Sequence, residues 1–98
     1  MKVKKLHGMG NHLAIDGLMC KRDKLRDESL IQNMLNNLPA KIGLNKMTQP
    51  KVVYHEAKNK SESGVTGFVL LCESHISIHT YPEKGFMVLD VFSIKELI

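Results

Sequence analysis

The sequence predicts an α+β fold in which an antiparallel sheet carries a helix packed on one face. Three observations lead to this class. One segment has apolar residues at helical spacing, several shorter segments read as strands, and the last strands are joined by connections short enough to imply antiparallel neighbours. With 98 residues, the chain is expected to form one domain, residues 1–98.

The first half of the chain is predicted to contain a strand and then a helix. Residues 11–20 alternate apolar with polar or small side chains, which is typical of a half-buried strand. The helix is expected to begin at Asp27, whose carboxylate can cap free amides. Pro39 is expected to end or bend it, with Gly43 just beyond the terminus. The apolar stripe of this helix comprises Leu30, Ile31, Met34, Leu35 and Leu38.

The second half is predicted to consist mainly of strands. Residues 58–64 are polar enough for a solvated loop, and residues 81–85 have the composition of a turn. Alternating or continuous apolar runs between these segments predict four strands. They cover residues 52–54, 67–72, 75–80 and 85–92.

Composition narrows the class of protein. Apolar residues make up 43% and charged residues 24%, as in ordinary globular domains. The net charge is +4, but the Lys and Arg residues are scattered and only five residues are aromatic, so we expect no nucleic-acid partner. No apolar run is long enough to span a membrane and no signal peptide is recognisable, which predicts a cytoplasmic protein. Cys20 and Cys72 are expected to be free thiols.

A chain of this length buries only about two-thirds of the surface that it exposes when unfolded. Its stability is therefore limited unless something else covers an apolar face of the sheet. We expect an oligomer for this reason.

One strand is predicted to carry a polar face. His75, Ser77 and His79 point to one side of it, while residues 76, 78 and 80 point to the other. Positions four apart on a strand are separated by roughly 13 Å, which excludes a metal held between the two histidines. These side chains fit either a reactive site or the wet face of a half-covered sheet.

The reversal at residues 72–75 is the second unusual feature. It contains no Gly, Pro or Asn, so the sequence indicates backbone strain in this turn. A serine placed there, Ser74, could attack the carbonyl of the preceding peptide bond if a proton carrier helps, and His79 is the nearest candidate on the returning strand.

Residues 73–83, ESHISIHTYPE, together with Gly85 and residues 90–92, resemble the processing and active-site signature of prokaryotic S-adenosylmethionine decarboxylase proenzymes. The resemblance extends more loosely to residues 10–13, to the predicted helix and to residues 64–67. It covers most of the chain between residues 10 and 93, and it implies the two-layer sandwich of that family.

The resemblance implies a self-cleaving, pyruvoyl-dependent enzyme without a metal. The serine matching Ser74 would attack the carbonyl of Glu73, and elimination and hydrolysis would leave a pyruvoyl group where Ser74 stood. The products would be a β chain of residues 1–73 and an α chain of residues 74–98. The pyruvoyl ketone would form a Schiff base with S-adenosylmethionine and withdraw electrons as CO₂ leaves. The decarboxylated product would supply aminopropyl groups for spermidine synthesis.

The resemblance also assigns roles to single residues. His79 matches the histidine that assists processing, and Thr66 stands where members commonly have a processing serine. Tyr81 stands where many members have a tryptophan that stacks on adenine, and an aromatic ring suits both adenine and the sulfonium charge. Glu83 matches the carboxylate that binds the ribose hydroxyls.

Three features depart from the family pattern. Ile94 stands where the family has the cysteine that reprotonates the substrate carbon, so a water or a histidine would have to replace it. Lys60 falls where some members have a second stacking aromatic. The chain ends at Ile98, whereas members usually continue with a further helix and strand that cover the sheet.

These departures leave alternatives to S-adenosylmethionine as substrate. One is a pyruvoyl-dependent decarboxylase of arginine or ornithine, against which Glu83 favours a nucleoside. The other is a non-catalytic relic or partner subunit. Family precedent and the uncovered sheet lead us to expect a homodimer with sites formed between or near its subunits.

Overall fold

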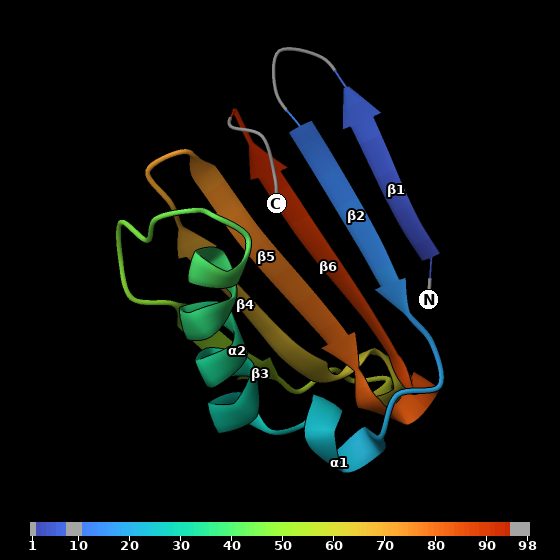
Figure 1. Cartoon of the computed structure of the whole chain (residues 1–98). Coiled ribbons are helices and arrows are strands. Elements are labelled where there is room, and N and C mark those ends of the chain that lie inside the picture. The colour runs from blue at the N-terminus through green and yellow to red at the C-terminus, as the bar shows by residue number, and fades with distance from the viewer. Residues whose placement is uncertain (1, 8–10, 95–98) are drawn as a thin grey trace.

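Residues 2–7 and 11–94 are described by the computed structural model of the chain. Their strands form one antiparallel sheet in the order β1-β2-β6-β5-β4-β3, with β5 and β6 at its centre (Figure 1). The predicted α+β class is confirmed. The strands are β1 (Lys2–His7), β2 (Asn11–Gly17), β3 (Lys51–His55), β4 (Gly64–Leu70), β5 (Ser74–Tyr81) and β6 (Phe86–Ser93).

The main helix, α2 (Glu28–Lys41), lies over the β3 and β4 side of the sheet, whereas β2 and β1 extend beyond it (Figure 1). A single helical turn, α1 (Arg22–Leu25), precedes it, and two 3₁₀ turns, η1 (Lys60–Glu62) and η2 (Pro82–Lys84), lie in the later connections. β1 and α1 are not predicted by the sequence. Both are short, and charged residues interrupt the apolar periodicity on which such predictions depend.

The start of α2 confirms the predicted cap. The Asp27 carboxylate accepts a hydrogen bond from the Leu30 amide at 3.1 Å. The helix does not end at Pro39, one of the two outcomes predicted for it, because α2 continues to Lys41. Pro39 lies in the last turn, where its carbonyl still accepts from the Ile42 amide at 3.1 Å. Gly43 follows with φ of 78°, a left-handed conformation that glycine adopts without strain.

The core lies between α2 and the face of the sheet that it covers. Ile31 and Leu35 from the helix are buried against alternate residues of β4 and β5. Gly67 lets the helix approach closely, because a Cβ there would lie 2.9 Å from Leu35 Cδ1. The buried strand residues are Val65, Val69, Ile76, Ile78, Leu89 and Val91.

A buried hydroxyl ties α1 to the sheet. Thr80 Oγ1 donates to the Leu25 carbonyl at 2.8 Å and accepts from the Val65 amide at 2.9 Å. Thr80→Val keeps the shape but leaves both backbone groups unpaired, so we expect it to lower the free energy of unfolding by about 2–4 kcal/mol. Denaturant unfolding measures this. The exposed Thr48→Val is the control, and an equal loss in both variants would contradict the role assigned to Thr80.

The opposite face of the sheet carries no helix among the described residues, and we call it the open face. The predicted polar row is confirmed there: His75, Ser77 and His79 lie on this face of β5, opposite to the buried side chains. Large apolar side chains accompany them. Val53, Phe68 and Leu70 of β3 and β4 are 51%, 42% and 41% exposed.

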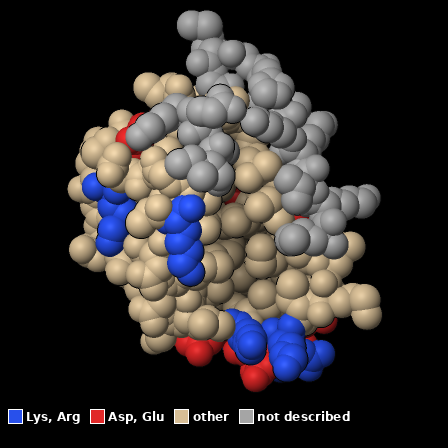
Figure 2. Space-filling model, in the orientation of Figure 1, with Lys and Arg blue, Asp and Glu red and all other residues tan. Residues whose placement is uncertain are grey.

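Charged side chains do not form a basic stripe on the side shown in Figure 2. Separate Lys and Arg side chains lie over the α2 side, and a mixed group of basic and acidic side chains lies at the end of the molecule where α1 is found. Both described cysteines are free thiols, as predicted. In the described ranges, no helix is long and apolar enough to cross a membrane.

Candidate active site

The Glu73–Ser74 peptide lies in the hairpin that joins β4 to β5. Leu71 and Ser74 close this hairpin, because the Leu71 amide donates to the Ser74 carbonyl at 2.9 Å and the Ser74 amide donates to the Leu71 carbonyl at 3.2 Å. The backbone strain predicted for this turn is not found in the φ angles of its residues. Among the described non-glycine residues only Met19 has a positive φ, so Cys72 and Glu73 make the turn with ordinary backbone angles.

Two segments distant in sequence hold Glu73. The Ile94 amide donates to the Glu73 carbonyl at 3.3 Å. The Asn45 amide and side-chain Nδ2 donate to the two oxygens of the Glu73 carboxylate at 3.1 and 3.0 Å, and the Cys72 amide donates to the Asn45 carbonyl at 2.9 Å. The carbonyl that Ser74 would attack therefore already has a hydrogen-bond donor that can stabilise negative charge on its oxygen.

Thr66 and His79 are brought together on the open face. They are directly paired across β4 and β5, and a hydrogen bond of 3.1 Å joins Thr66 Oγ1 to His79 Nδ1. Ser74, half-buried at the start of β5, lies five residues before His79 on the same strand. At about 3.3 Å per residue the two are roughly 16 Å apart, so one chain does not bring this histidine to its own Ser74.

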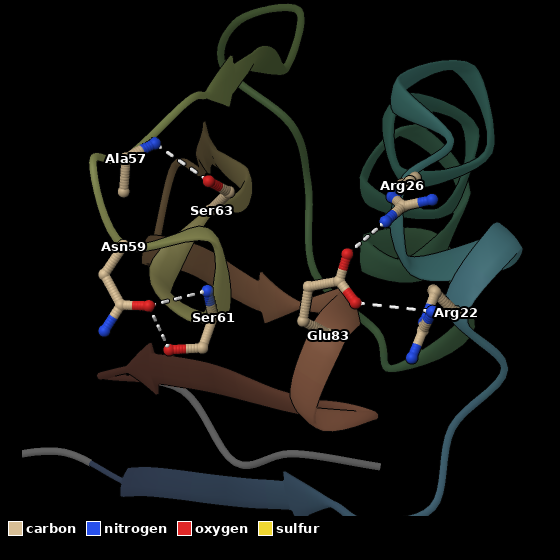
Figure 3. Close-up of polar contacts among 7 residues, drawn as sticks. All are labelled: Arg22, Arg26, Ala57, Asn59, Ser61, Ser63 and Glu83. Atoms are coloured by element: carbon tan, nitrogen blue, oxygen red, sulfur yellow. Dashed lines mark hydrogen bonds and ion pairs between the residues drawn. The ribbon is translucent and has the colours of Figure 1, made fainter.

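The predicted substrate-binding residues lie at the His79 end of β5. The Tyr81 ring stacks on Phe86 with centroids 6.0 Å apart, and Lys84 Nζ lies 5.7 Å from the Tyr81 centroid. Glu83 in η2 is paired with Arg22 of α1 and with Arg26, which follows it: Glu83 Oε1 lies 2.6 Å from Arg26 Nη2 and Oε2 lies 3.3 Å from Arg22 Nη1 (Figure 3). Tyr81 and Glu83 are thus separated from Ser74 by most of the length of the strand.

A cavity of about 120 Å³ lies beside Glu83. The loop that forms one wall is shaped by local bonds: the Ala57 amide donates to Ser63 Oγ, and Asn59 Oδ1 caps η1 by accepting from the Ser61 amide (Figure 3). Pockets that bind small molecules usually have volumes of roughly 300–1,000 Å³. This cavity is therefore too small to enclose such a ligand by itself. It is lined by Arg26, Tyr54, Glu56, Lys60, Ser63, Pro82 and Glu83.

The structure also assembles pairs that are not predicted from the sequence. His12 Nε2 contacts Asp90 Oδ1 on the open face, across β2 and β6, and the Phe92 ring lies 6.1 Å from the His12 ring and 5.9 Å from that of His75. His12 and Asp90 both fall within segments that carry the family resemblance, which is the signal that could have identified them. For Asn45 the sequence offers no comparable signal.

No group of three or more His, Cys, Asp or Glu side chains suited to a metal occurs in the described part of the chain. The residues at the hairpin fit a prosthetic group made from the chain itself. A serine follows a carbonyl that is already hydrogen-bonded, and the position matching the family's proton donor, Ile94, contacts that carbonyl through its amide.

The fold defines a class of small α+β proteins with a helix-backed antiparallel sheet, and the candidate residues Ser74 and His79 lie on its central strand β5. The model of the S-adenosylmethionine decarboxylase family matches residues 11–98. The chain belongs to this family.

Individual relatives agree with the family assignment. The S-adenosylmethionine decarboxylase proenzyme of Brevibacillus brevis is 36% identical over 89 residues, which are 91% of this chain and 62% of the relative. That of Synechococcus sp. is 35% identical over 85 residues, 87% of this chain and 62% of the relative. The crystal structure of the adenosylmethionine decarboxylase from Aquifex aeolicus superposes with a TM-score of 0.70 and 32% identity, and the match covers 89% of this chain and 67% of that one.

The chain spans 62% to 64% of the length of the curated relatives from Synechococcus sp. and Thermodesulfovibrio yellowstonii. The part in common includes the hairpin and the strands that carry Thr66, His79 and Tyr81.

Proposed function

We propose that this protein is an S-adenosylmethionine decarboxylase of polyamine synthesis, which matures by cutting itself between Glu73 and Ser74 into residues 1–73 and 74–98. Its family supports this proposal. The observation that carries it is the geometry of the hairpin: the serine directly follows a carbonyl that already accepts a hydrogen bond from the Ile94 amide.

The cut requires no external reagent except water. The Ser74 hydroxyl oxygen attacks the Glu73 carbonyl carbon, the peptide C–N bond breaks, and the proton of the hydroxyl ends on the Ser74 nitrogen, which leaves an ester. Loss of the Ser74 Cα proton then expels the Glu73 carboxylate and leaves a double bond between Cα and Cβ. Water replaces the nitrogen, ammonia is released, and residue 74 becomes pyruvoyl.

A pyruvoyl group at residue 74 would supply a ketone for the substrate amine and an electron sink for decarboxylation. The chain's own residues position the substrate. Tyr81 offers an aromatic face to adenine and the sulfonium. Each oxygen of a carboxylate can accept about two hydrogen bonds, so Glu83 retains capacity for ribose hydroxyls while Arg22 and Arg26 hold it in place.

We further propose that the active form is a cytoplasmic homodimer in which each site takes residues from both chains. Ser74 and Ile94 lie at one end of β5, whereas Thr66, His79 and Tyr81 lie at or near the other. Consider a two-fold axis that is parallel to the open face and perpendicular to the strands. It would place the two open faces against each other with their strands running in opposite directions, so the Ser74 end of one chain would meet the His79 end of its partner.

The open face is suited to such a contact. Stacked sheets pack about 10 Å apart with interdigitating side chains. Val53, Phe68 and Leu70 expose a contiguous apolar area on two neighbouring strands, which an isolated chain would leave in water.

Turnover with labelled substrates tests the activity. S-adenosylmethionine with a labelled carboxyl group is expected to release labelled CO₂, whereas arginine and ornithine are expected to release none, because neither has a ribose for Glu83. Release from arginine or ornithine instead would contradict the proposed substrate. Absence of release from all three, with the chain cut, would favour a partner subunit that processes but does not decarboxylate.

Ile94→Cys is expected to raise turnover. The Ile94 side chain is 71% exposed beside the cleavage hairpin and has no proton to donate, so a thiol there would supply the missing donor. Positioned acids typically contribute about 100- to 10,000-fold, and we expect a gain at the lower end because another donor already operates. Ile94→Ser is the matched control of similar polarity. An unchanged rate in Ile94→Cys would show that the existing donor is sufficient.

A further inference from the structure

Asn45, which lies outside the hairpin, binds both oxygens of the Glu73 carboxylate through its backbone amide and its side chain. It lies in the connection between α2 and β3. Its amide donates to Glu73 Oε1 at 3.1 Å and its Nδ2 donates to Oε2 at 3.0 Å, while its carbonyl accepts from the Cys72 amide at 2.9 Å. We call these three hydrogen bonds the Asn45 clamp.

The segment that carries Asn45 is itself fixed against the hairpin. Lys46 forms a bridge with Leu71, and the Met47 amide donates to the Leu70 carbonyl at 2.8 Å. Leu44, next to Asn45, is buried in the core. The backbone of Asn45 is therefore fixed on both sides, by the buried Leu44 before it and by the contacts of Lys46 and Met47 after it.

We propose that Asn45 is a positioning residue for self-cleavage: it fixes the side chain and backbone of Glu73 so that the Glu73 carbonyl stays in reach of the Ser74 hydroxyl. This inference rests on the proposed function. Attack requires the reacting atoms to be about 3–3.5 Å apart and correctly aligned. The Ile94 amide binds the carbonyl oxygen at 3.3 Å, and the clamp fixes the side chain of the same residue at its two carboxylate oxygens.

The clamp has a second consequence once the chain is cut. Asn45, Cys72 and Glu73 all belong to the 1–73 fragment, whereas Ile94 belongs to the 74–98 fragment. Glu73 then carries a new terminal carboxylate next to residue 74. Because the clamp lies within one fragment, it can hold this end at the loop that carries Asn45 after the cut.

Four variants test the polarity of the clamp. Asn45→Asp places a second carboxylate against that of Glu73 and removes the Nδ2 donor. Glu73→Gln is compatible with Asn45, because the Asn45 amide can turn over and accept from the new NH₂ group. Asn45→Asp combined with Glu73→Gln restores a donor facing an acceptor. Asn37→Asp makes the same chemical change on the exposed surface of α2 and serves as the control.

The rate of self-cleavage is followed by gel or mass spectrometry after rapid purification. We expect Asn45→Asp to slow cleavage about 10- to 100-fold, the size of effect that misplacement by about 1 Å can cause. Asn37→Asp is expected to stay within about 3-fold of the unchanged protein, and the double variant within about 3-fold of Glu73→Gln alone, which sets the reference rate for the neutral side chain. Recovery in the double variant is the result that a merely structural role of Asn45 would not give.

Two outcomes would overturn the inference. One is cleavage of Asn45→Asp at the unchanged rate, and the other is equal slowing of Asn45→Asp and the double variant. If Asn45→Asp fails to fold, Asn45→Ala, which keeps the backbone donor, replaces it, and an unchanged cleavage rate in that variant would equally contradict the clamp. An unchanged protein that never cuts would instead refute the proposed function.

Hydrogen exchange gives a readout that does not depend on cleavage. In a Ser74→Ala background, which keeps the chain intact, Asn45→Asp is expected to speed exchange of the Cys72 amide at least about 10-fold relative to the background alone, since that amide donates to the Asn45 carbonyl. Equal exchange in the two proteins would show that the clamp does not hold the hairpin.

Discussion

Ser74→Ala is expected to remain a single chain of 98 residues and to release no CO₂ from S-adenosylmethionine. The variant lacks the only oxygen that can attack the Glu73 carbonyl from the following residue, and without the cut no ketone forms. Loss of both cleavage and turnover should be complete within detection. Intact-mass measurement and CO₂ release on the same preparation check the two losses together.

Ser77→Ala is the matched control for this prediction. Ser77 lies on the same strand and is also half-buried, but on the open face and remote from the Glu73–Ser74 peptide. We expect it to cut normally. If Ser74→Ala were still split before residue 74, the nucleophile would have to be another group, and the role given to the Ser74 hydroxyl would be wrong.

Co-expression of Ser74→Ala with His79→Ala is expected to restore a cut that neither variant makes alone. In a mixed dimer, the His79→Ala chain contributes Ser74 and the Ser74→Ala chain contributes His79, so one of the two sites is complete. Only the His79→Ala chain should be cut, since the other chain has no serine at the junction. Different affinity tags on the two chains identify which one is cleaved.

The control for complementation is co-expression of Ser74→Ala with a second copy of Ser74→Ala, which lacks a serine at every junction and should stay intact. Absence of cleavage in verified mixed dimers of Ser74→Ala and His79→Ala would contradict the shared site. The roughly 16 Å between Ser74 and His79 along β5 would then need another explanation, such as a different proton carrier within the chain.

The fold could be predicted from the sequence wherever the periodicity of apolar residues is strong. The apolar stripe that includes Ile31 and Leu35 predicts α2, and the alternation in residues 75–80 predicts both β5 and the two faces of its side chains. Pro39 shows the limit of local rules. It removes one helical hydrogen bond, yet the helix extends two residues beyond it and the Pro39 carbonyl still accepts from the Ile42 and Leu44 amides.

The residues of the candidate site could be predicted from the sequence, but their arrangement in space could not. The arithmetic that excludes a metal between His75 and His79 also separates Ser74 from His79, and it points to a second chain. The turn contains none of the residues expected in tight reversals, yet none of its residues has a positive φ, and a distant segment binds it through the Cys72 amide and the Glu73 side chain. That segment contributes Asn45, which meets Glu73 through tertiary packing that no short-range pattern encodes.

The most direct test of the central claim is the intact mass of the purified protein after incubation under native conditions. We expect two fragments divided between Glu73 and Ser74, the smaller one carrying a keto group in place of its amino terminus and resisting Edman degradation. Borohydride treatment should add two hydrogens to that fragment alone. A single mass corresponding to the uncut 98 residues, from protein shown to be folded, would contradict self-activation.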